Sequence, residues 1–491
     1  MSQHVYSQKD INGIIVSDTS NFRIIKVWGN HYERGYALGY LDGDRMLNLY
    51  KNYIIPALSQ QGVDTLKKYI QEEKHFVIQQ KYHIEAEGMV EGIIDAGHSA
   101  EDLNKYDILA ANTFFDFIGF ISKEKNSSFG CSSLMNWGDA TLGTDLNGAS
   151  VISRHVDWTP NIHLINSSSV VAHIPQEEDE QAWIMIGFAG QMSALSGINS
   201  SSLAVFHHSL SDFYGTALKN KVYEPVWFTT RNALEVMDYN SDNVTNTNDL
   251  RDAVAQNISG YANGSILCAV SNTDITFDSL TAIVIESACF EPYHTYRYND
   301  FDDLIPGDNL YAANSSVKRN DMHNYEPRYM NIVNNIGDGT LIDDDINWTL
   351  MKEYSNSSSH NIQFMQYIPN RNILNISVAD IDHYAYQKEP VSIYIDTLFV
   401  IPAVNKVEDK ESEIFRIFPN PVLKNKKVNI EIDGMDCNSV QIIDVQGKFI
   451  EEMNVSEFKN KIQLNLDLER GVYFIRFCNK NNLKLKKLIV L

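Results

Sequence analysis

The chain has 491 residues, of which 44 % are apolar and 11 % aromatic, which is enough for roughly two or three domains and excludes wholesale disorder. The formal charge at pH 7 is −23, and the acidic excess lies before residue 413, because the remainder carries 13 Lys and Arg against 10 Asp and Glu. Such a surface repels phosphate, so nucleic acid is not an expected partner. No run of about 18 apolar residues occurs, so no membrane span is predicted.

The first 401 residues show two different patterns of apolar and polar residues. Residues 1–130 begin with an apolar, β-branched strand and continue with helical spacing of apolar residues. From Cys131 the pattern changes to period-two alternation, as in CSSLMNW and ASVISRHVDW, which is typical of consecutive antiparallel strands. Helical stretches and then further strands complete residues 131–401. This order of elements predicts an α+β sandwich.

The C-terminal part has a different character. Residues 402–412 are charged and predict a linker, and residues 413–491 contain short alternating segments about 10 residues apart, which indicates a small all-β sandwich. FPNPV (418–422), IIDVQGKFI (442–450), LERGVYFIRF (468–477) and the ending KKLIVL resemble the C-terminal domain recognised by the type IX secretion system of Bacteroidetes. The resemblance implies a secreted or cell-surface protein with that machinery as a partner. We expect its natural precursor to carry a signal peptide.

Cys131 is the candidate nucleophile, because it follows Gly130 directly at the onset of the predicted strands. A thiol reacts as the thiolate, and an N-terminal residue can use its own α-amino group as the base once the chain is cut before it. We therefore predict self-cleavage between Gly130 and Cys131, where a glycine leaves room for an N-to-S acyl shift. Taken alone, the Gly-Cys pair fits a small buried cysteine better.

Two charged residues follow in SRHVDW, namely Arg154 and Asp157. A guanidinium near the thiol favours the thiolate, and a carboxylate can orient the new α-amino group and hold Arg154. Strand alternation places these two positions on opposite faces, so both are directed towards Cys131 only if the strand bends or ends there. A salt bridge on an edge strand is the alternative interpretation.

These residues resemble a known group. G-C-S followed by R-x-x-D-W is similar to the acyl-CoA:6-aminopenicillanate acyltransferase-like and choloylglycine hydrolase-like branch of the N-terminal nucleophile hydrolases. Further similar motifs follow the order of that branch: GNHYERGYALG (29–39), EAEGMVEGI (85–93), GINSSSLAV (197–205) and LYAANSS (310–316). Ser202, Ala313 and Ser315 depart from its usual Gly, Thr and His. The resemblance implies a four-layer αββα sandwich.

The resemblance also implies roles for individual residues. Cys131 is the nucleophile and, through its α-amine, the base. Arg154 and Asp157 flank it, Asn314 is the main candidate donor to the oxyanion, and Asn199 is a second polar candidate. Both asparagines also fit ordinary turn residues, because each stands beside Ser, Gly or Ala.

The sequence therefore predicts a secreted, self-cleaving cysteine hydrolase of linear amides, or an acyltransferase, acting through a thioester on a small-molecule amide or N-acyl substrate. A phospholipase-B-like hydrolase, sharing the C-S-x-L start, and a non-catalytic surface-binding protein on the same fold are the alternatives. No cofactor or metal is expected, since the acidic runs at 300–304 and 342–346 lack the spacing of an EF-hand loop. The acyl and amine groups, and whether the chain forms a homo-oligomer, are left open.

Overall fold

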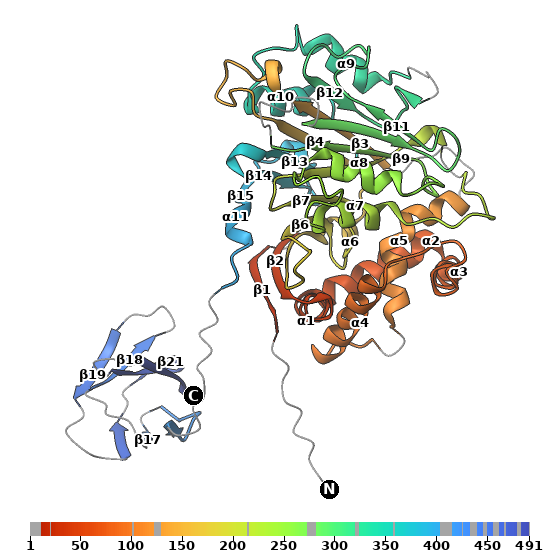
Figure 1. The fold of residues 1–491 in the computed structure, drawn as a ribbon. Coiled ribbons are helices and arrows are strands. Elements are labelled where there is room, and N and C mark those ends of the chain that lie inside the picture. The colour runs from red at the N-terminus through yellow and green to blue at the C-terminus, as the bar shows by residue number, and fades with distance from the viewer. Residues whose placement is uncertain are drawn as a thin grey trace. The chain divides into compact units, whose positions relative to one another are not determined.

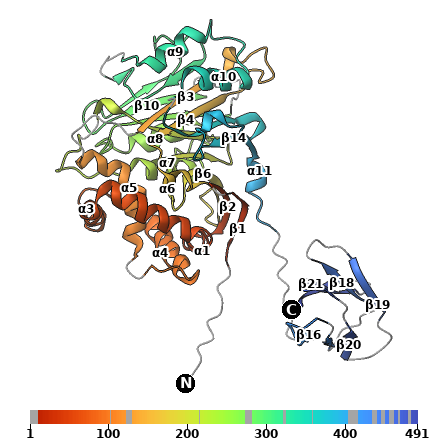
Figure 2. The ribbon, with the colours of Figure 1, turned by 180° about the vertical axis from the view of Figure 1, so that it is seen from behind.

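Two units make up the computed structural model of the protein, Met1–Ile401 and Pro402–Leu491. The structure describes residues 11–19, 21–100, 103–121, 129–213, 216–272, 281–319, 324–356, 359–402, 415–424, 426–432, 439–444, 449–454, 461–465, 468–478 and 483–490. Each unit has its own sheets (Figures 1 and 2). Each also has its own buried apolar side chains.

The larger sheet of the first unit has nine strands in the order β1-β2-β5-β6-β7-β8-β9-β10-β11. They are β1 Gly13–Asp18, β2 Phe22–Gly29, β5 Ser168–Pro175, β6 Trp183–Phe188, β7 Ser196–Asn199, β8 Ala204–Ser209, β9 Ser265–Val270, β10 Ala282–Ser287 and β11 His294–Arg297. Neighbours pair antiparallel except β2 and β5, which run parallel. A parallel pair needs a long crossover, and here the crossover contains the N-terminal helices and the first hairpin of the second sheet.

The second sheet carries Cys131 and has the order β12-β3-β4-β13-β14-β15. Its strands are β12 Asn309–Ala312, β3 Phe129–Asn136, β4 Val151–Trp158, β13 Asn361–Ile368, β14 Ile373–Val378 and β15 Val391–Tyr394, all paired antiparallel. β3 begins two residues before Cys131, because Phe129 and Gly130 already pair with Trp158 and Asp157. Gly130 and Cys131 are therefore both held in a strand.

Helices cover the outer faces of the two sheets. They are α1 His31–Leu49, continued by the π-helical turn η1 Tyr50–Ile54, then α2 Ile55–Leu58, α3 Gln60–Gln71, α4 Gln80–Asp95, α5 Lys105–Ile121, α6 Ile162–Ile165, α7 Val226–Glu235, α8 Thr247–Ala255, α9 Pro327–Asn335, α10 Asp344–Tyr354 and α11 Ile395–Leu398. α1 contacts β2 and β5, α10 contacts β3 and β4, and β3 of one sheet contacts β8 of the other (Figure 1). The predicted four-layer αββα sandwich is confirmed.

α1 and α4 pack with their backbones in direct contact. A Cβ on Gly35 would lie 2.0 Å from the Glu85 carbonyl oxygen, and one on Gly39 would lie 2.1 Å from that of Met89. Real Cβ atoms cannot approach so closely, so glycine is required at both positions. The glycines of the entry motif therefore set the distance between these two helices.

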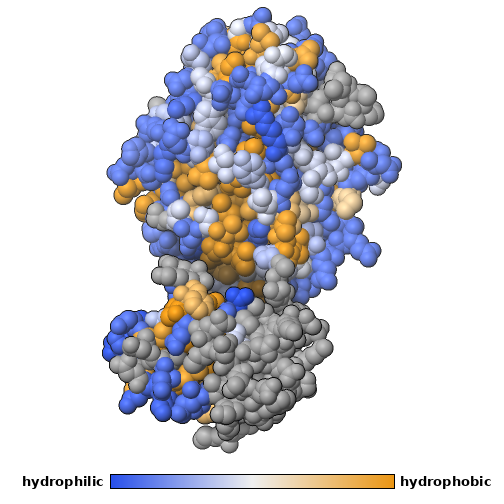
Figure 3. All heavy atoms as spheres, turned by 90° about the vertical axis from the view of Figure 1, so that its left-hand side faces the viewer, coloured by the Kyte–Doolittle hydropathy of each residue, from blue (hydrophilic) through white to orange (hydrophobic). Residues whose placement is uncertain are grey.

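One side of the first unit contains the edges of both sheets, β1 and β15. Lys26 on β2 donates hydrogen bonds to the carbonyl oxygens of Thr397 and Val400, at 2.6 and 3.2 Å, and so ties the larger sheet to the segment after β15. Ile14 on β1 and Val391 on β15 expose 37 % and 54 % of their surface. Figure 3 looks at this side and shows apolar side chains among polar ones.

The second unit consists of two small sheets. One has the order β16-β17-β20 and the other β19-β18-β21-β22. The strands are β16 Phe415–Phe418, β17 Lys427–Ile432, β18 Ser439–Asp444, β19 Phe449–Asn454, β20 Lys461–Asn465, β21 Gly471–Cys478 and β22 Leu483–Val490. Side chains from both sheets, among them Ile430 and Ile442, share one apolar cluster. The predicted small all-β domain is confirmed.

Candidate active site

Cys131 lies on β3 between the two sheets and is only 5 % exposed. Three polar side chains contact it: Arg154 Nη2 donates to Sγ over 3.7 Å, the backbone N–H donates to Asn314 Oδ1 at 2.8 Å, and Arg328 Nη1 donates to the carbonyl oxygen at 3.2 Å. Burial raises the pKa of the thiol, and the Arg154 guanidinium opposes this rise. The sulfur, the amide and the carbonyl of one residue are thus each held by a separate side chain.

Arg154 is fully buried on β4. It also donates to the hydroxyl of Ser196 on β7 and to the backbone carbonyl of His207 on β8. No carboxylate among the described residues forms an ion pair with it. A buried guanidinium without a carboxylate stabilises an anion placed beside it, and the Cys131 sulfur is the group that lies there.

Asp157 is not the partner of Arg154. Its Oδ2 accepts from Arg328 Nη1 at 3.2 Å and its Oδ1 from Asn361 Nδ2 at 2.9 Å. Burial raises the pKa of Asp157 to about 7, against the pull of Arg328. Arg154 and Asp157 reach Cys131 from opposite faces of the strand, Arg154 at the thiol and Asp157 beside Gly130, so no bend is needed to bring both near.

Gly130 lies directly against this ion pair. A Cβ on Gly130 would lie 3.2 Å from the Cβ of Asp157, 3.6 Å from its Oδ2 and 3.7 Å from Arg328 Nη1. Such a contact is tight, so a larger residue here would press on the pair. The carboxyl of Asp157 therefore stands next to the bond between residues 130 and 131.

Asn314 follows β12 and is the centre of a small network. Its Oδ1 accepts from the Cys131 N–H and, at 2.7 Å, from Arg328 Nη2, while its Nδ2 donates to the carbonyl of Ser209 at 2.6 Å. Its backbone N–H donates to Glu326 Oε1 at 2.7 Å. The side-chain oxygen of Asn314, rather than its amide nitrogen, faces Cys131.

Asn199 takes no part in this network. At the end of β7 its Oδ1 accepts from the N–H groups of Ser201 and Leu203, at 3.1 and 2.9 Å, and its Nδ2 donates to the carbonyl of Leu234 at 3.1 Å. None of these hydrogen bonds reaches Cys131 or its partners. The structure places Asn199 in the turn between β7 and β8.

Arg328 is a site residue that sequence reasoning missed. It stands in the first turn of α9, just after Pro327, and its guanidinium joins Asp157, Asn314, Glu326 and the Cys131 carbonyl. The local sequence EPRYM has no catalytic pattern. The packing of α9 against β12 is what brings the Arg328 guanidinium to the Cys131 carbonyl.

An apolar pocket adjoins the site. Its walls come from α1, η1, α5 and the ends of β4 and β6, and include Tyr53, Phe114, Trp158, Phe188 and Trp227. Trp158 follows Asp157 directly on β4. Trp227 Nε1 donates at 3.1 Å to the ring of His207, whose carbonyl accepts from Arg154. The pocket is therefore linked to the residues around the thiol through Trp158 and Trp227, although Cys131 itself does not line it.

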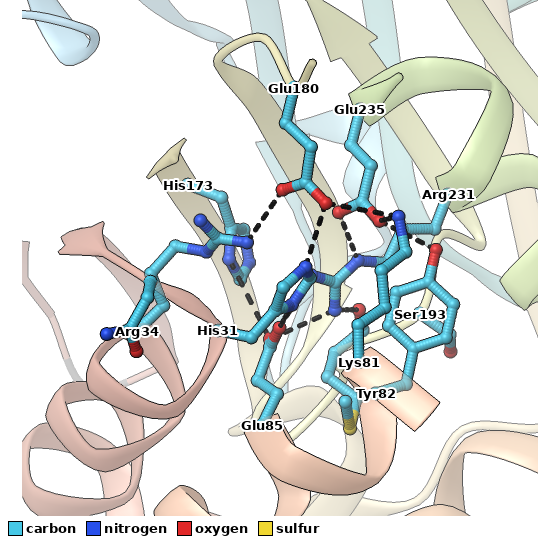
Figure 4. Close-up of polar contacts among 12 residues, drawn as sticks. His31, Arg34, Lys81, Tyr82, Glu85, His173, Glu180, Ser193, Arg231 and Glu235 are labelled. Atoms are coloured by element: carbon cyan, nitrogen blue, oxygen red, sulfur yellow. Dashed lines mark hydrogen bonds and ion pairs between the residues drawn. The ribbon is translucent and has the colours of Figure 1, made fainter. Parts of the chain in front are cut away.

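A second buried polar cluster joins helices α1, α4 and α7 (Figure 4). We call it the charge cluster; its members are His31, Arg34, Lys81, Tyr82, Glu85, Glu177, Glu180, Arg231 and Glu235. Glu85 on α4 contacts His31 Nδ1 at 2.7 Å and Arg231 Nη2, on α7, at 2.6 Å. α1 and α4 precede Cys131 in the chain and α7 follows it. These ion pairs hold together the two segments that a cut before Cys131 would create.

Part of the charge cluster has the spacing of a metal site. The ligand atoms of His31, Glu177 and Glu180 lie within 4.8 Å of one another. Arg34 already pairs with Glu177 and Glu180, at 2.7 and 3.0 Å, and Lys81 lies 3.1 Å from Glu180. The carboxylates are thus neutralised by protein cations, and the arrangement fits an ion-pair network rather than a metal centre.

Comparison with known proteins gives a family match for the second unit. Residues 416–491 match the family model described as the secretion system C-terminal sorting domain. This match indicates a secreted or cell-surface protein, as predicted. No helix among the described residues has both the length and the apolar character needed to cross a bilayer. No curated protein matches the chain.

Solved structures similar to part of this chain include amide hydrolases. The N-acylethanolamine-hydrolyzing acid amidase ortholog of Caenorhabditis elegans is 13 % identical, with 54 % of this chain and 100 % of that chain covered and a TM-score of 0.35. A mutant conjugated bile acid hydrolase from Clostridium perfringens is 12 % identical, with 55 % and 94 % covered and a TM-score of 0.32. At these TM-scores the likeness says nothing of the substrate of this chain.

Proposed function

We propose that this protein is a secreted cysteine hydrolase of linear amide bonds, or an acyltransferase, that activates itself by cutting the chain between Gly130 and Cys131. The observation that carries the proposal is the surroundings of Cys131. Its sulfur faces a buried guanidinium that pairs with no carboxylate in the described part of the chain, while its amide nitrogen, the future α-amine, is held by Asn314.

Self-cleavage begins with attack of the Cys131 sulfur on the carbonyl carbon of Gly130. A C–S bond forms, the C–N bond breaks, and the thiol proton ends on the freed α-amine of Cys131. Asp157, with a pKa of about 7, is protonated in part of the molecules at neutral pH and can relay this single proton, giving its own proton to the leaving nitrogen and taking up the thiol proton in exchange. Water then hydrolyses the thioester, which leaves a carboxylate on Gly130 and a free thiol on Cys131.

Substrate turnover uses the same atoms. The α-amine takes the thiol proton, the sulfur attacks the substrate carbonyl, and the amine of the substrate leaves with that proton. Asn314 Oδ1 keeps the α-amine in place, and Arg154 stabilises the thiolate. Water or another amine then accepts the acyl group from the thioester. Without Arg154, Cys131 would lie in a site where burial disfavours the thiolate.

The adjoining pocket supports an apolar acyl group. Its lining is almost entirely aliphatic and aromatic, and Trp158 connects it with the strand that carries Arg154 and Asp157. An acyl chain bound there loses apolar surface to the pocket, at about 25 cal/mol per Å². We infer that substrates are amides of apolar acids.

The proposal is tested with a series of N-acyl amides that differ only in acyl length. We expect kcat/KM to rise as the acyl chain lengthens, and acid quenching to trap an acyl adduct on Cys131 that intact-mass analysis detects. Trp158→Ala should abolish the preference for long chains while the shortest substrate is still cut. The non-catalytic alternative predicts no adduct and no product, and a phospholipase-B-like enzyme would release fatty acid from phospholipids instead.

A further inference from the structure

The sheet that carries Cys131 has a break in its ladder of backbone hydrogen bonds, and the break lies at Cys131. β12 pairs antiparallel with β3, and this pairing ends where Ala312 lies opposite Ser133. If the pairing continued in the same register, Asn314 would lie opposite Cys131, and the two residues could exchange backbone hydrogen bonds. We call this absent pair of Asn314 and Cys131 the missing rung.

All four backbone groups of the missing rung form other hydrogen bonds. The Cys131 N–H donates to the Asn314 side chain at 2.8 Å, and the Cys131 carbonyl accepts from Arg328 at 3.2 Å. The Asn314 N–H donates to Glu326 Oε1 at 2.7 Å, and the Asn314 carbonyl accepts from the N–H and the hydroxyl of Ser211, at 2.8 and 2.7 Å. Each group that a strand pair would satisfy is therefore satisfied from outside the ladder.

The missing rung leaves the nitrogen of Cys131 outside the strand ladder. The proposed self-cleavage converts this nitrogen from a planar amide into a tetrahedral amine, which changes the direction of its N–H bonds. A backbone carbonyl in a strand has a fixed direction, whereas the Asn314 side chain can follow the nitrogen by small rotations about its own bonds. The contact between Asn314 Oδ1 and this nitrogen is therefore suited to both states of the chain.

His208 on β8 holds Ala313, the residue between the last pair of the ladder and the missing rung. His208 Nδ1 lies 3.2 Å from the carbonyl oxygen of Ala313, and its Nε2 lies 2.8 Å from the hydroxyl of Ser133. The side chain is fully buried, and burial and the Arg154 cation lower the pKa of His208 well below its usual value, so the imidazole is neutral. A carbonyl can only accept, so Nδ1 carries the proton and donates to Ala313, while Nε2 accepts from Ser133.

These contacts close a ring of hydrogen bonds that begins and ends on β3. From Ser133 the ring passes through the imidazole of His208 to the Ala313 carbonyl. From there the chain leads to Asn314, whose side chain returns to the N–H of Cys131. Ser133 and Cys131 stand two residues apart on the same strand, so β3 fixes both ends of the ring. The distance from Asn314 to the Cys131 nitrogen therefore depends on the hydrogen bond that His208 donates.

Building on the proposed self-cleavage, we propose that His208 is a positioning residue that holds the chain after β12 away from β3, so that the Cys131 nitrogen bonds to the Asn314 side chain. The Nδ1–H group of His208 does this by taking up the carbonyl of Ala313. Ser133 donates to Nε2 and so keeps the proton of the neutral ring on Nδ1. His208 acts through Asn314 and touches no reacting atom.

Two substitutions of His208 separate this role from packing. In His208→Asn the side-chain nitrogen stands at the δ position, where it can still donate to Ala313. In His208→Gln it stands one bond further out, where it can reach Ser133 but not Ala313. We expect His208→Asn to cut itself within about threefold of the wild-type rate and His208→Gln to be about 10- to 100-fold slower, since a shift of roughly 1 Å at a reacting atom has an effect of that size. Packing alone predicts the opposite order, because Gln fills more of the space of the imidazole.

Deuterium uptake measures the same role without any chemistry. In the full chain carrying Cys131→Ala, which stays uncut, the peptide covering residues 309–316 should exchange its amide hydrogens faster with His208→Gln than with His208→Asn. The reason is that the segment after β12 loses its anchor to β8 only in the Gln variant. His383→Gln, the same substitution at an exposed histidine, is the matched control and should equal the wild type in both measurements.

Three results would overturn the proposal. They are equal cleavage rates in His208→Asn and His208→Gln, a faster rate in His208→Gln, and equal deuterium uptake in the two variants. If His208→Gln does not fold, His208→Ala replaces it, with the same expectation. A wild-type chain that is never cut would contradict the proposed function, and deuterium uptake alone would then decide the role of His208.

Discussion

Asn314 Oδ1 accepts a hydrogen bond from the backbone N–H of Cys131 at 2.8 Å, across 183 residues of chain. The nitrogen it holds is the leaving group of the proposed self-cleavage and the base of the proposed turnover. Asn314→Ala should slow self-cleavage about 100-fold, because a displacement of roughly 1 Å at a reacting atom has an effect of that size. A time course on denaturing gels measures it.

Asn199→Ala is the control for this experiment. Asn199 organises the turn after β7 and does not contact Cys131, so its loss should lower thermal stability while the folded protein still cuts itself at the wild-type rate. Equal cleavage defects in the two variants would mean that Asn314 acts only through stability.

The raised pKa of Asp157 predicts how the rate of self-cleavage depends on pH. Burial raises its pKa to about 7, so the carboxyl is protonated below that pH and loses its proton above it. If it donates a proton to the leaving nitrogen, the rate should fall as pH rises through about 7. Asp157→Asn keeps the shape but has no proton to donate, so its slower cleavage should lack this decline. A wild-type rate that rises through pH 7 would exclude the role.

Arg154 should control the acidity of the thiol. Arg154→Gln removes the charge beside Sγ, so the effect of burial, which raises the pKa of Cys131, is opposed less strongly. In matured protein we expect a roughly 100- to 1,000-fold lower kcat, similar to the loss of one donor to a developing charge. The rate of thiol alkylation as a function of pH provides the second readout, and its midpoint should shift to higher pH. An unchanged midpoint would show that Arg154 serves packing alone.

The charge cluster should hold the two segments together. Glu85→Gln leaves Arg231 and His31 without their common carboxylate, and breaking a buried ion pair costs about 3–5 kcal/mol. Urea unfolding of the uncut Cys131→Ala protein measures this loss. Glu87→Gln removes a half-exposed partner of Lys105 and should change stability by less than about 0.5 kcal/mol. Comparable losses in the two variants would contradict the account.

The fold was largely predictable from sequence, because hydrophobic periodicity and glycine spacing are local signals. Cys131, Arg154 and Asp157 stand within 27 residues of one another on two paired strands, so their convergence followed from a hairpin. Arg328 could not be found in this way, since its role depends on α9 packing against a distant sheet. Asp157 is not the partner of Arg154, because strand alternation points the two side chains to opposite faces. The cation that pairs with Asp157 is Arg328, which the local sequence does not reveal.

Intact-mass analysis and N-terminal sequencing of the purified full chain test the central claim most directly. The account predicts two polypeptides that separate only on denaturation, the second beginning with Cys131. Cys131→Ala should remain one chain. Cys289→Ala, which removes a buried cysteine that is hydrogen-bonded to Thr216, should be cut normally. A wild-type protein that stays a single chain, with Gly130 and Cys131 still joined, would contradict the account.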